Sequence, residues 1–222
     1  MSSTRNPAHG FTLIEMMIVV AVFGLLASLI AINISRQRPR ATLASVTADL
    51  QGLIHGARQS ALASGHDTIV MLFPERADQK PARVVVLEDP TFTFMAGGGA
   101  LDFDGYDPEV LRYPDGGRVE HLDLPGDIEF GPATGMGSAL PAPLDTINVL
   151  VPCSFCSADA SRNLRGAIRF DARGAATFYD TNAVKRPSGN GASFTLTNPD
   201  LGQRNTFIIL SSTGVVQVQQ HY

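Results

Sequence analysis

The feature that most constrains this chain is an apolar run at residues 11–34. Four polar side chains interrupt it: Thr12, Glu15, Ser28 and Asn33. About 20 apolar residues in a helix are enough to cross a lipid bilayer. The residues before the run are polar and end in Gly10. An ordinary secretory signal is cut after its apolar segment, whereas cleavage at this glycine would keep the apolar helix in the mature protein.

Glu15 is the one ionisable residue of the apolar run. A carboxylate at the centre of a membrane helix costs about 2.5–3.5 kcal/mol, so we expect Glu15 to have a partner. Its place in the first turn puts it near the positive end of the helix dipole. After cleavage, the α-amino group of Phe11 on a neighbouring subunit could neutralise it further. The alternative is that Glu15 lies at the level of the lipid headgroups.

Residues 10–15 read G-F-T-L-I-E, which resembles the signature of type IV prepilins and type II secretion pseudopilins. The resemblance implies that a membrane-bound prepilin peptidase cuts between Gly10 and Phe11, removes the leader 1–10, and that Phe11 is N-methylated. It assigns to Glu15 the registering of an incoming subunit in a filament. The implied partners are other pilin or pseudopilin subunits, the peptidase and the inner-membrane assembly platform.

Two signals disagree on the orientation of this helix. Arg36, Arg38 and Arg40 follow the apolar run and only Arg5 precedes it, so the positive-inside rule alone would place the far end in the cytoplasm. The resemblance implies the reverse: residues 11–35 span the bacterial inner membrane once and the C-terminal domain lies in the periplasm, before assembly into a pilus or pseudopilus. We follow the resemblance, because the peptidase acts on the cytoplasmic side.

A second helical pattern covers residues 36–65. Apolar side chains recur there at the spacing of one helix face: Leu43, Val46, Leu50, Leu53, Ile54, Ala57 and Ala61. We expect Pro39 to break or kink the helix between its two halves, and Gly65 to cap it after Ser64. The stripe predicts a helix that packs on a sheet.

Residues 66–222 carry short strand-like runs separated by Gly, Pro and Asp, which is typical of an antiparallel sheet or sandwich. The runs are TIVMLF, ARVVVLE, TFTFM, GRVEHLDL, TINVLV, GAIRFD, GAATFYD, ASFTLT, TFIILS and GVVQVQ. Two hairpins are expected to turn at residues 172–174 and 212–214, where Gly174 and Gly214 can take a positive φ. The predicted fold class is α+β: a long N-terminal helix, half membrane and half amphipathic, packed on an antiparallel β domain in a pilin-like arrangement.

The end of the chain resembles the GspH/FimT-type branch of pilin-like proteins, whose β domain closes with R-x-x-x-I-x-x-S-x-x-G-x-V. The matching residues here are Arg204, Ile208, Ser211, Gly214 and Val216. Residues 96–115 look like an insertion. The resemblance implies a structural role. Our leading hypothesis is a minor pilin of a type IV pilus, low in copy at the tip or in the priming of assembly, and the alternative is a minor pseudopilin (H class) of a type II secretion system.

A basic stretch stands out from the formal net charge of −4. Its residues are Arg162, Arg165, Arg169, Arg173, Lys185 and Arg186. Such charges can bind phosphates, contact another subunit or simply be solvated. Related FimT-type pilins that bind DNA carry arginines in a C-terminal G-R-x-R element, where this chain has GVVQ at 214–217. Nucleic acid is therefore not an expected partner, and a DNA-uptake pilin is the least favoured function.

The only two cysteines are Cys153 and Cys156. Two thiols cannot fill the four-ligand shell of a structural zinc ion without histidines, and no histidine lies near them in the sequence. The strand-to-helix setting of a thioredoxin-like site is also missing. In an exported domain we expect a disulfide, and two inert free thiols are the alternative.

Other candidate sites carry less weight. Asp102, Asp104, Asp107 and Glu109 offer oxygen ligands of the kind that calcium prefers, but their spacing is not that of an EF-hand, and a solvated acidic loop is the alternative. The glycines at 97–99 lack the lysine of a phosphate-binding loop. The histidines are scattered along the sequence: His55, His66, His121 and His221. We therefore expect neither enzymatic activity nor a cofactor.

Overall fold

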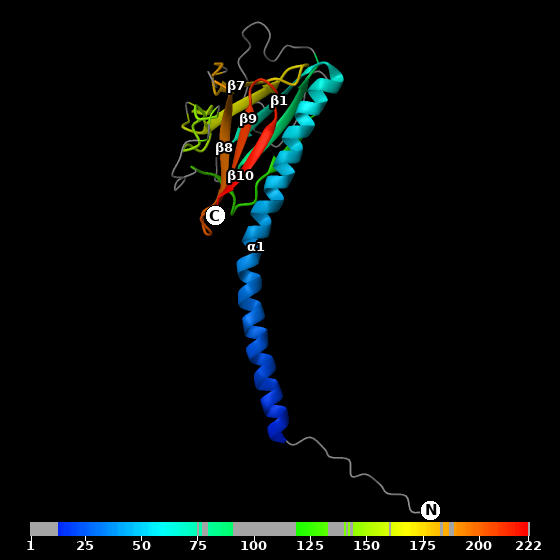
Figure 1. The fold of residues 1–222 in the computed structure, drawn as a ribbon, viewed down its shortest axis with the longest axis vertical. Helices are drawn as coiled ribbons and strands as arrows, with labels where there is room; N and C mark the ends of the chain where they lie inside the picture. Colours follow the sequence, from blue (N-terminus) through cyan, green and yellow to red (C-terminus); the bar gives the residue numbers. More distant parts are fainter. Residues whose placement is uncertain are drawn as a thin grey trace, which may run out of the picture. The chain divides into compact units, whose positions relative to one another are not determined.

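The computed structural model describes residues 13–74, 76, 80–90, 119–132, 140, 142, 144–159, 161–182, 184–186 and 189–221, apart from the side chains of residues 29–39, 119 and 221. The chain divides into two compact units, Met1–Ala41 and Thr42–Tyr222. The N-terminal part of one long helix belongs to the first unit. Its C-terminal part and all described strands belong to the second (Figure 1).

A single helix, α1 (Leu13–Ser64), covers both predicted helical segments. The break expected at Pro39 is wrong, because this residue lies inside α1. A proline inside a helix removes one N–H donor and crowds the carbonyl four residues earlier, but the turns on both sides of it continue α1 and outweigh this local cost. The predicted end is confirmed. Gly65 has a φ of 72° and donates its N–H to the Ala61 carbonyl at 3.1 Å, which closes the last turn.

The strands form two antiparallel sheets. Sheet A has the order β3-β2-β1-β6-β5, with β7 also paired to β6. Its strands are β1 (Asp67–Phe73), β2 (Arg83–Asp89), β3 (Val119–Asp123), β5 (Ser157–Ala158), β6 (Leu164–Phe170) and β7 (Ala176–Asp180). Sheet B has the order β10-β9-β8-β4. Its strands are β4 (Glu129–Phe130), β8 (Gly191–Asn198), β9 (Gln203–Leu210) and β10 (Val216–His221). The predicted antiparallel β domain is confirmed.

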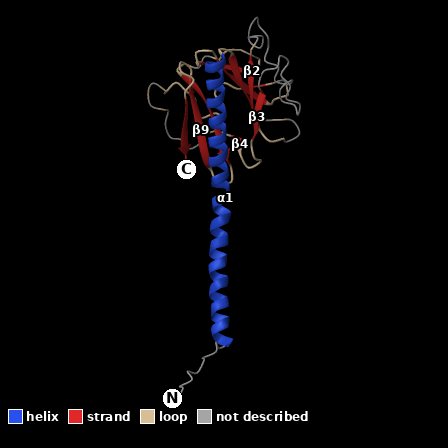
Figure 2. Cartoon of the chain, turned by 90° about the vertical axis from the view of Figure 1, so that its right-hand side faces the viewer, coloured by secondary structure: helices blue, strands red, loops and turns tan. Residues whose placement is uncertain are grey.

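The C-terminal half of α1 packs on the strands, as the apolar stripe predicted (Figure 2). Six members of the stripe are buried and Leu53 is half-buried; the buried ones are Leu43, Val46, Leu50, Ile54, Ala57 and Ala61. They share one core with side chains of both sheets, such as Val70 and Phe207. Burying a leucine or isoleucine contributes about 1.5–3 kcal/mol, so this stripe is the main attachment of α1 to the β domain.

Some strand predictions were wrong. The run TINVLV at 146–151 forms no strand, although Ile147 and Val149 are buried. Asn148 explains part of this, because its side-chain oxygen accepts the Leu150 N–H at 3.0 Å and so competes with a strand ladder. Strands β4 and β5 were missed, since two residues are too few to form an alternating pattern. The run TFTFM lies outside the described residues.

Both predicted hairpin turns are confirmed, and they touch each other. Gly174 between β6 and β7 has a φ of 77°, and Gly214 between β9 and β10 has a φ of 63°. A Cβ added to Gly214 would lie 2.2 Å from the Gly174 carbonyl oxygen. Arg58 of α1 joins the two turns, because its Nε donates to the carbonyls of Gly174 at 3.3 Å and Thr213 at 2.7 Å. The helix and two hairpins therefore meet at one point.

Candidate functional site

The described large apolar side chains of the first unit are exposed. From Leu13 to Leu26, the large apolar side chains are between 43% and 78% exposed. A helix that is apolar on all sides needs an apolar environment or partner helices to cover it. Counted over the described residues, which omit the side chains of 29–39, no helix is both long and apolar enough to cross a membrane.

Glu15 lies in the first turn of α1, at the place that the sequence predicted. Its side chain is exposed, and the positive end of the helix dipole is close to it. Gly10 and Phe11, the predicted sites of cleavage and methylation, lie outside the described residues. The same holds for the weak calcium candidates Asp102, Asp104, Asp107 and Glu109.

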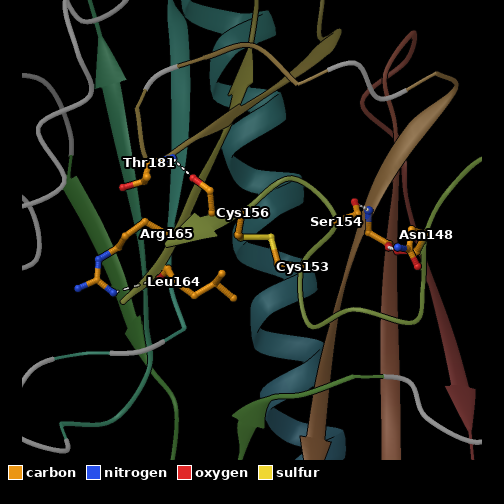
Figure 3. Close-up of a disulfide and its surroundings, with 9 residues drawn as sticks. Asn148, Cys153, Ser154, Cys156, Leu164, Arg165 and Thr181 are labelled. Atoms are coloured by element: carbon orange, nitrogen blue, oxygen red, sulfur yellow. Dashed lines mark hydrogen bonds between the residues drawn. A yellow bond between two sulfur atoms is a disulfide. The ribbon is translucent and has the colours of Figure 1, made fainter. Parts of the chain in front are cut away.

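The two cysteines form a disulfide, with Cα atoms 5.4 Å apart (Figure 3). Of the two alternatives that the sequence left open, the disulfide is confirmed. It lies in residues 152–156, a segment that we call the clasp. Cys153 is buried and forms an isolated β-bridge with Phe194 of β8, so the clasp begins at the edge of sheet B.

Several hydrogen bonds hold the clasp to β8. The Ser154 N–H donates to the Ser193 carbonyl at 2.8 Å, and the Thr195 N–H donates to the Pro152 carbonyl at 2.9 Å. In addition, the Ser193 N–H donates to Ser154 Oγ at 2.9 Å. The clasp thus takes the place of a neighbouring strand along part of β8.

The other end of the clasp is attached to sheet A. Strand β5 follows it directly and pairs with the start of β6. Phe155 is fully buried, with its ring centroid 5.2 Å from that of Phe178 in β7. A Cβ added to Gly166 of β6 would lie 2.6 Å from Cys156 Sγ and 3.0 Å from the Phe155 ring. The clasp therefore links the two sheets, and glycine at position 166 leaves the space that it needs.

Four of the six residues in the predicted basic cluster have acidic partners within the domain. The pairs are Arg165–Asp159 at 4.0 Å, Arg169–Asp67 at 2.7 Å, Arg173–Asp171 at 3.1 Å and Arg186–Asp180 at 2.6 Å. Burial opposes the charge of Arg169, but its contacts with Tyr179 and Asp67 outweigh this and raise its pKa above the ordinary value. Charges that are already paired contribute less to phosphate binding, which weakens that interpretation of the cluster.

A cavity of about 320 Å³ lies beside the clasp. Its described lining includes Thr146, Asn148, Ser154 and Phe155, together with the charged Arg186, which pairs with Asp180. Among the described residues, no group of three or more His, Cys, Asp or Glu side chains could hold a metal ion.

The C-terminal pattern falls on one hairpin. Arg204 and Ile208 lie in β9, Ser211 and Gly214 in the turn, and Val216 at the start of β10. Ile208 and Val216 are buried, and Gly214 needs its positive φ. The pattern therefore describes the packing and turning of the last two strands.

The contacts that the sequence did not predict are those that join distant segments. Arg58 bonds carbonyls 116 and 155 positions away in the chain, and Asp67 pairs with Arg169 across 102 positions. No local spacing relates such residues. Gly166 carried a signal that could have been used, because a glycine inside a strand often marks a close approach of another segment.

Comparison with known proteins gives a match for the N-terminal part of the chain. Residues 5–31 match the model of the prokaryotic N-terminal methylation motif. No curated protein and no solved structure matches the chain. The motif implies processing by a prepilin peptidase and assembly with other pilin subunits. Together with the N-terminal helix packed on antiparallel sheets, it supports a type IV prepilin-like protein, of the pilin or pseudopilin kind.

Proposed function

We propose that this chain is a minor pilin of a type IV pilus, of the GspH/FimT type, low in copy at the tip or in the priming of assembly. The observation that carries the proposal is the methylation motif at residues 5–31. The motif overlaps the N-terminal part of α1, where the described large apolar side chains are exposed. The C-terminal half of α1 packs in the core of the β domain. In such a chain, the apolar part of the helix can pack against the helices of neighbouring subunits, and the folded domain lies on the surface of the filament. In this role it is not an enzyme and needs no cofactor.

Before assembly, residues 11–35 anchor the chain in the bacterial inner membrane as a single span. The amphipathic segment 36–65 and the β domain 66–222 lie in the periplasm. Prepilin peptidase removes residues 1–10, and the assembly platform of the inner membrane then transfers the subunit from lipid into a bundle of pilin helices. The apolar side chains exchange lipid contacts for contacts with other helices.

Glu15 sets the axial register in this bundle. A carboxylate in apolar surroundings costs about 2.5–3.5 kcal/mol, and the methylated α-amino group of Phe11 on a neighbouring subunit offsets that cost at one axial position. Registers that leave Glu15 without this amine are therefore disfavoured.

Two variants in the native host test the proposal. We expect Gly10→Val to block cleavage, so that the protein on an immunoblot keeps the mass of the leader. We expect Glu15→Ala to be cleaved but depleted from sheared filaments. Ser28→Ala is the matched control, because the Ser28 hydroxyl donates to the Leu25 carbonyl of its own helix at 2.7 Å. Normal maturation of Gly10→Val would refute the processing step, and normal incorporation of Glu15→Ala would refute the register role.

The second candidate is a minor pseudopilin of the H class in a type II secretion system, since the same motif precedes both kinds of subunit. Deletion of the gene separates the two. Loss of surface pili supports the pilin, and loss of protein secretion with intact pili supports the pseudopilin. A DNA-uptake pilin, the third candidate, predicts lower transformation with pili and secretion intact.

A further inference from the structure

Strand β8 has one fully paired edge and one edge that is covered piece by piece. Along the first edge it pairs with β9 from Gly191 to Asn198. Along the second, β4 covers Leu196 and Thr197. The clasp covers the N–H and carbonyl of Ser193 and the N–H of Thr195 through the hydrogen bonds given above. The Thr195 carbonyl accepts instead from the Gly131 N–H at 3.1 Å. Backbone groups of an uncovered strand edge are ready to pair with other chains, so the state of the clasp decides whether this part of β8 is protected.

The clasp has little regular secondary structure on either side of it. Residues 144–151 before it form no strand and β5 after it has only two residues, although Ser193 Oγ donates to the Asn148 carbonyl at 2.8 Å. Its own backbone bonds with β8 connect single residues and do not form a regular ladder. Phe155 holds the other end of the clasp in the core. The disulfide, which closes the loop of residues 153–156, is therefore the element that ties residues 152–154, the part bonded to β8, to that buried end. Closing a loop of this length lowers the chain entropy enough to shift an opening equilibrium about 20-fold.

We propose that the Cys153–Cys156 disulfide is a redox-sensitive lock on the outer edge of β8. When it is oxidised, the clasp stays paired with Ser193 and Thr195. When it is reduced, the clasp detaches locally and exposes the N–H and carbonyl of Ser193 and the N–H of Thr195, while β9 keeps its side of β8. The proposal concerns the β domain alone and does not depend on the role in a filament.

The chemistry of the lock is thiol–disulfide exchange. On oxidation, the two thiols lose two protons and two electrons and form one S–S bond. The electrons pass to the disulfide of an external oxidoreductase of the dithiol–disulfide class, which becomes a dithiol. A small dithiol such as dithiothreitol reverses the step and is itself oxidised to a cyclic disulfide.

Residue-resolved amide hydrogen exchange, measured by NMR on the full chain in detergent, tests the lock. The chain contains only these two cysteines, so dithiothreitol acts on this bond alone. After reduction we expect the amides of Ser193 and Thr195 to exchange about 20-fold faster. All three residues from Ser193 to Thr195 pair with β9, but the N–H groups of Ser193 and Thr195 point to the clasp. Because these directions alternate along a strand, the N–H of Phe194 points to β9, and its exchange should stay unchanged. It is an internal control in the same strand.

The double variant Cys153→Ser, Cys156→Ser repeats the test without reductant and should show the same two fast amides. If Phe194 accelerates as much as its neighbours on reduction, the whole sheet has opened and the local lock is wrong. If none of the three amides accelerates while alkylation and mass spectrometry confirm two free thiols, the disulfide holds nothing at this edge. Should the double variant fail to fold, the reduced native chain still decides between these results.

Discussion

The contact between the two hairpin turns leads to a sharp prediction about Gly214. An added Cβ there would lie 2.2 Å from the Gly174 carbonyl oxygen and 3.0 Å from the Phe170 ring. The oxygen belongs to the backbone of a second tight turn, which cannot rotate away as a flexible side chain can. Gly214→Ala therefore forces the two turns apart. Gly202 offers a matched control, because its φ is also 63° and nothing lies within 4 Å of an added Cβ.

The difference between the two variants isolates the contact. A left-handed backbone costs a residue other than glycine about 1–2 kcal/mol, and this cost is common to both positions. The loss of unfolded-state entropy on replacing glycine by alanine is also common to both. Overpacking at a tight contact adds about 1–3 kcal/mol. We expect Gly202→Ala to lower the free energy of unfolding by about 1–2 kcal/mol, and Gly214→Ala by about 2–5 kcal/mol.

Urea unfolding followed by circular dichroism measures both values on the full chain in detergent. The midpoint should fall further for Gly214→Ala, with a slope equal to that of Gly202→Ala, because both unfold the same domain. Equal midpoints for the two variants would refute the reasoning, since the strain of positive φ would then account for the whole effect and the turns would not be in contact.

Three further predictions concern single residues. Gly166→Ala should destabilise the domain by about 1–3 kcal/mol, because its Cβ meets the clasp, whereas Gly126→Ala has open space; equal stability of the two would exclude the close approach. Arg58→Met keeps the aliphatic stem but loses the donor to two turn carbonyls, and the same titration should show a loss of about 1–3 kcal/mol. The hydrogen bond from Arg83 lowers the pKa of the Asp123 carboxyl in the folded protein below its ordinary value. The pair therefore contributes its full stabilisation above the pKa of the unfolded state, about 3.9. This stabilisation is lost as the pH falls through the lower pKa of the folded state. Asp123→Asn should flatten that part of the acid-unfolding curve, and an unaltered curve would contradict the assignment.

What the sequence predicted well were features that local spacing controls. The stripe from Leu43 to Ala61 has the helix period, and burial on one face follows from it. The turns at Gly174 and Gly214 were found because a positive φ favours glycine wherever a short loop joins two strands. The end of α1 at Gly65 has the same cause. Each of these features depends on residues a few positions apart, so the local sequence was enough to predict it.

Where prediction failed, a competing local effect or a distant segment decided the outcome. Pro39 did not end α1, because the turns on both sides of it outweigh the lost donor and the crowding of the carbonyl four residues earlier. The run at 146–151 had strand composition, but Asn148 bonds its own backbone and β8 already has other neighbours. In the basic cluster, Arg169 looked available for a partner because its acid, Asp67, comes from another part of the chain.

The cysteine pair lies between these two cases. The disulfide could be predicted from the short spacing of Cys153 and Cys156. Its position between the two sheets could not, because no residue near the pair indicates that β8 and β6 are its neighbours. One letter did carry that information. Gly166 is the first residue of the run GAIRFD but lies inside β6, which begins at Leu164. Glycine weakens a strand, and its presence in a buried strand is best explained by another segment that needs the space of its missing Cβ. In this chain the disulfide and the Phe155 ring occupy it. An unfavourable glycine within a strand and a cysteine pair in a nearby loop, taken together, would therefore have predicted the contact between the clasp and β6.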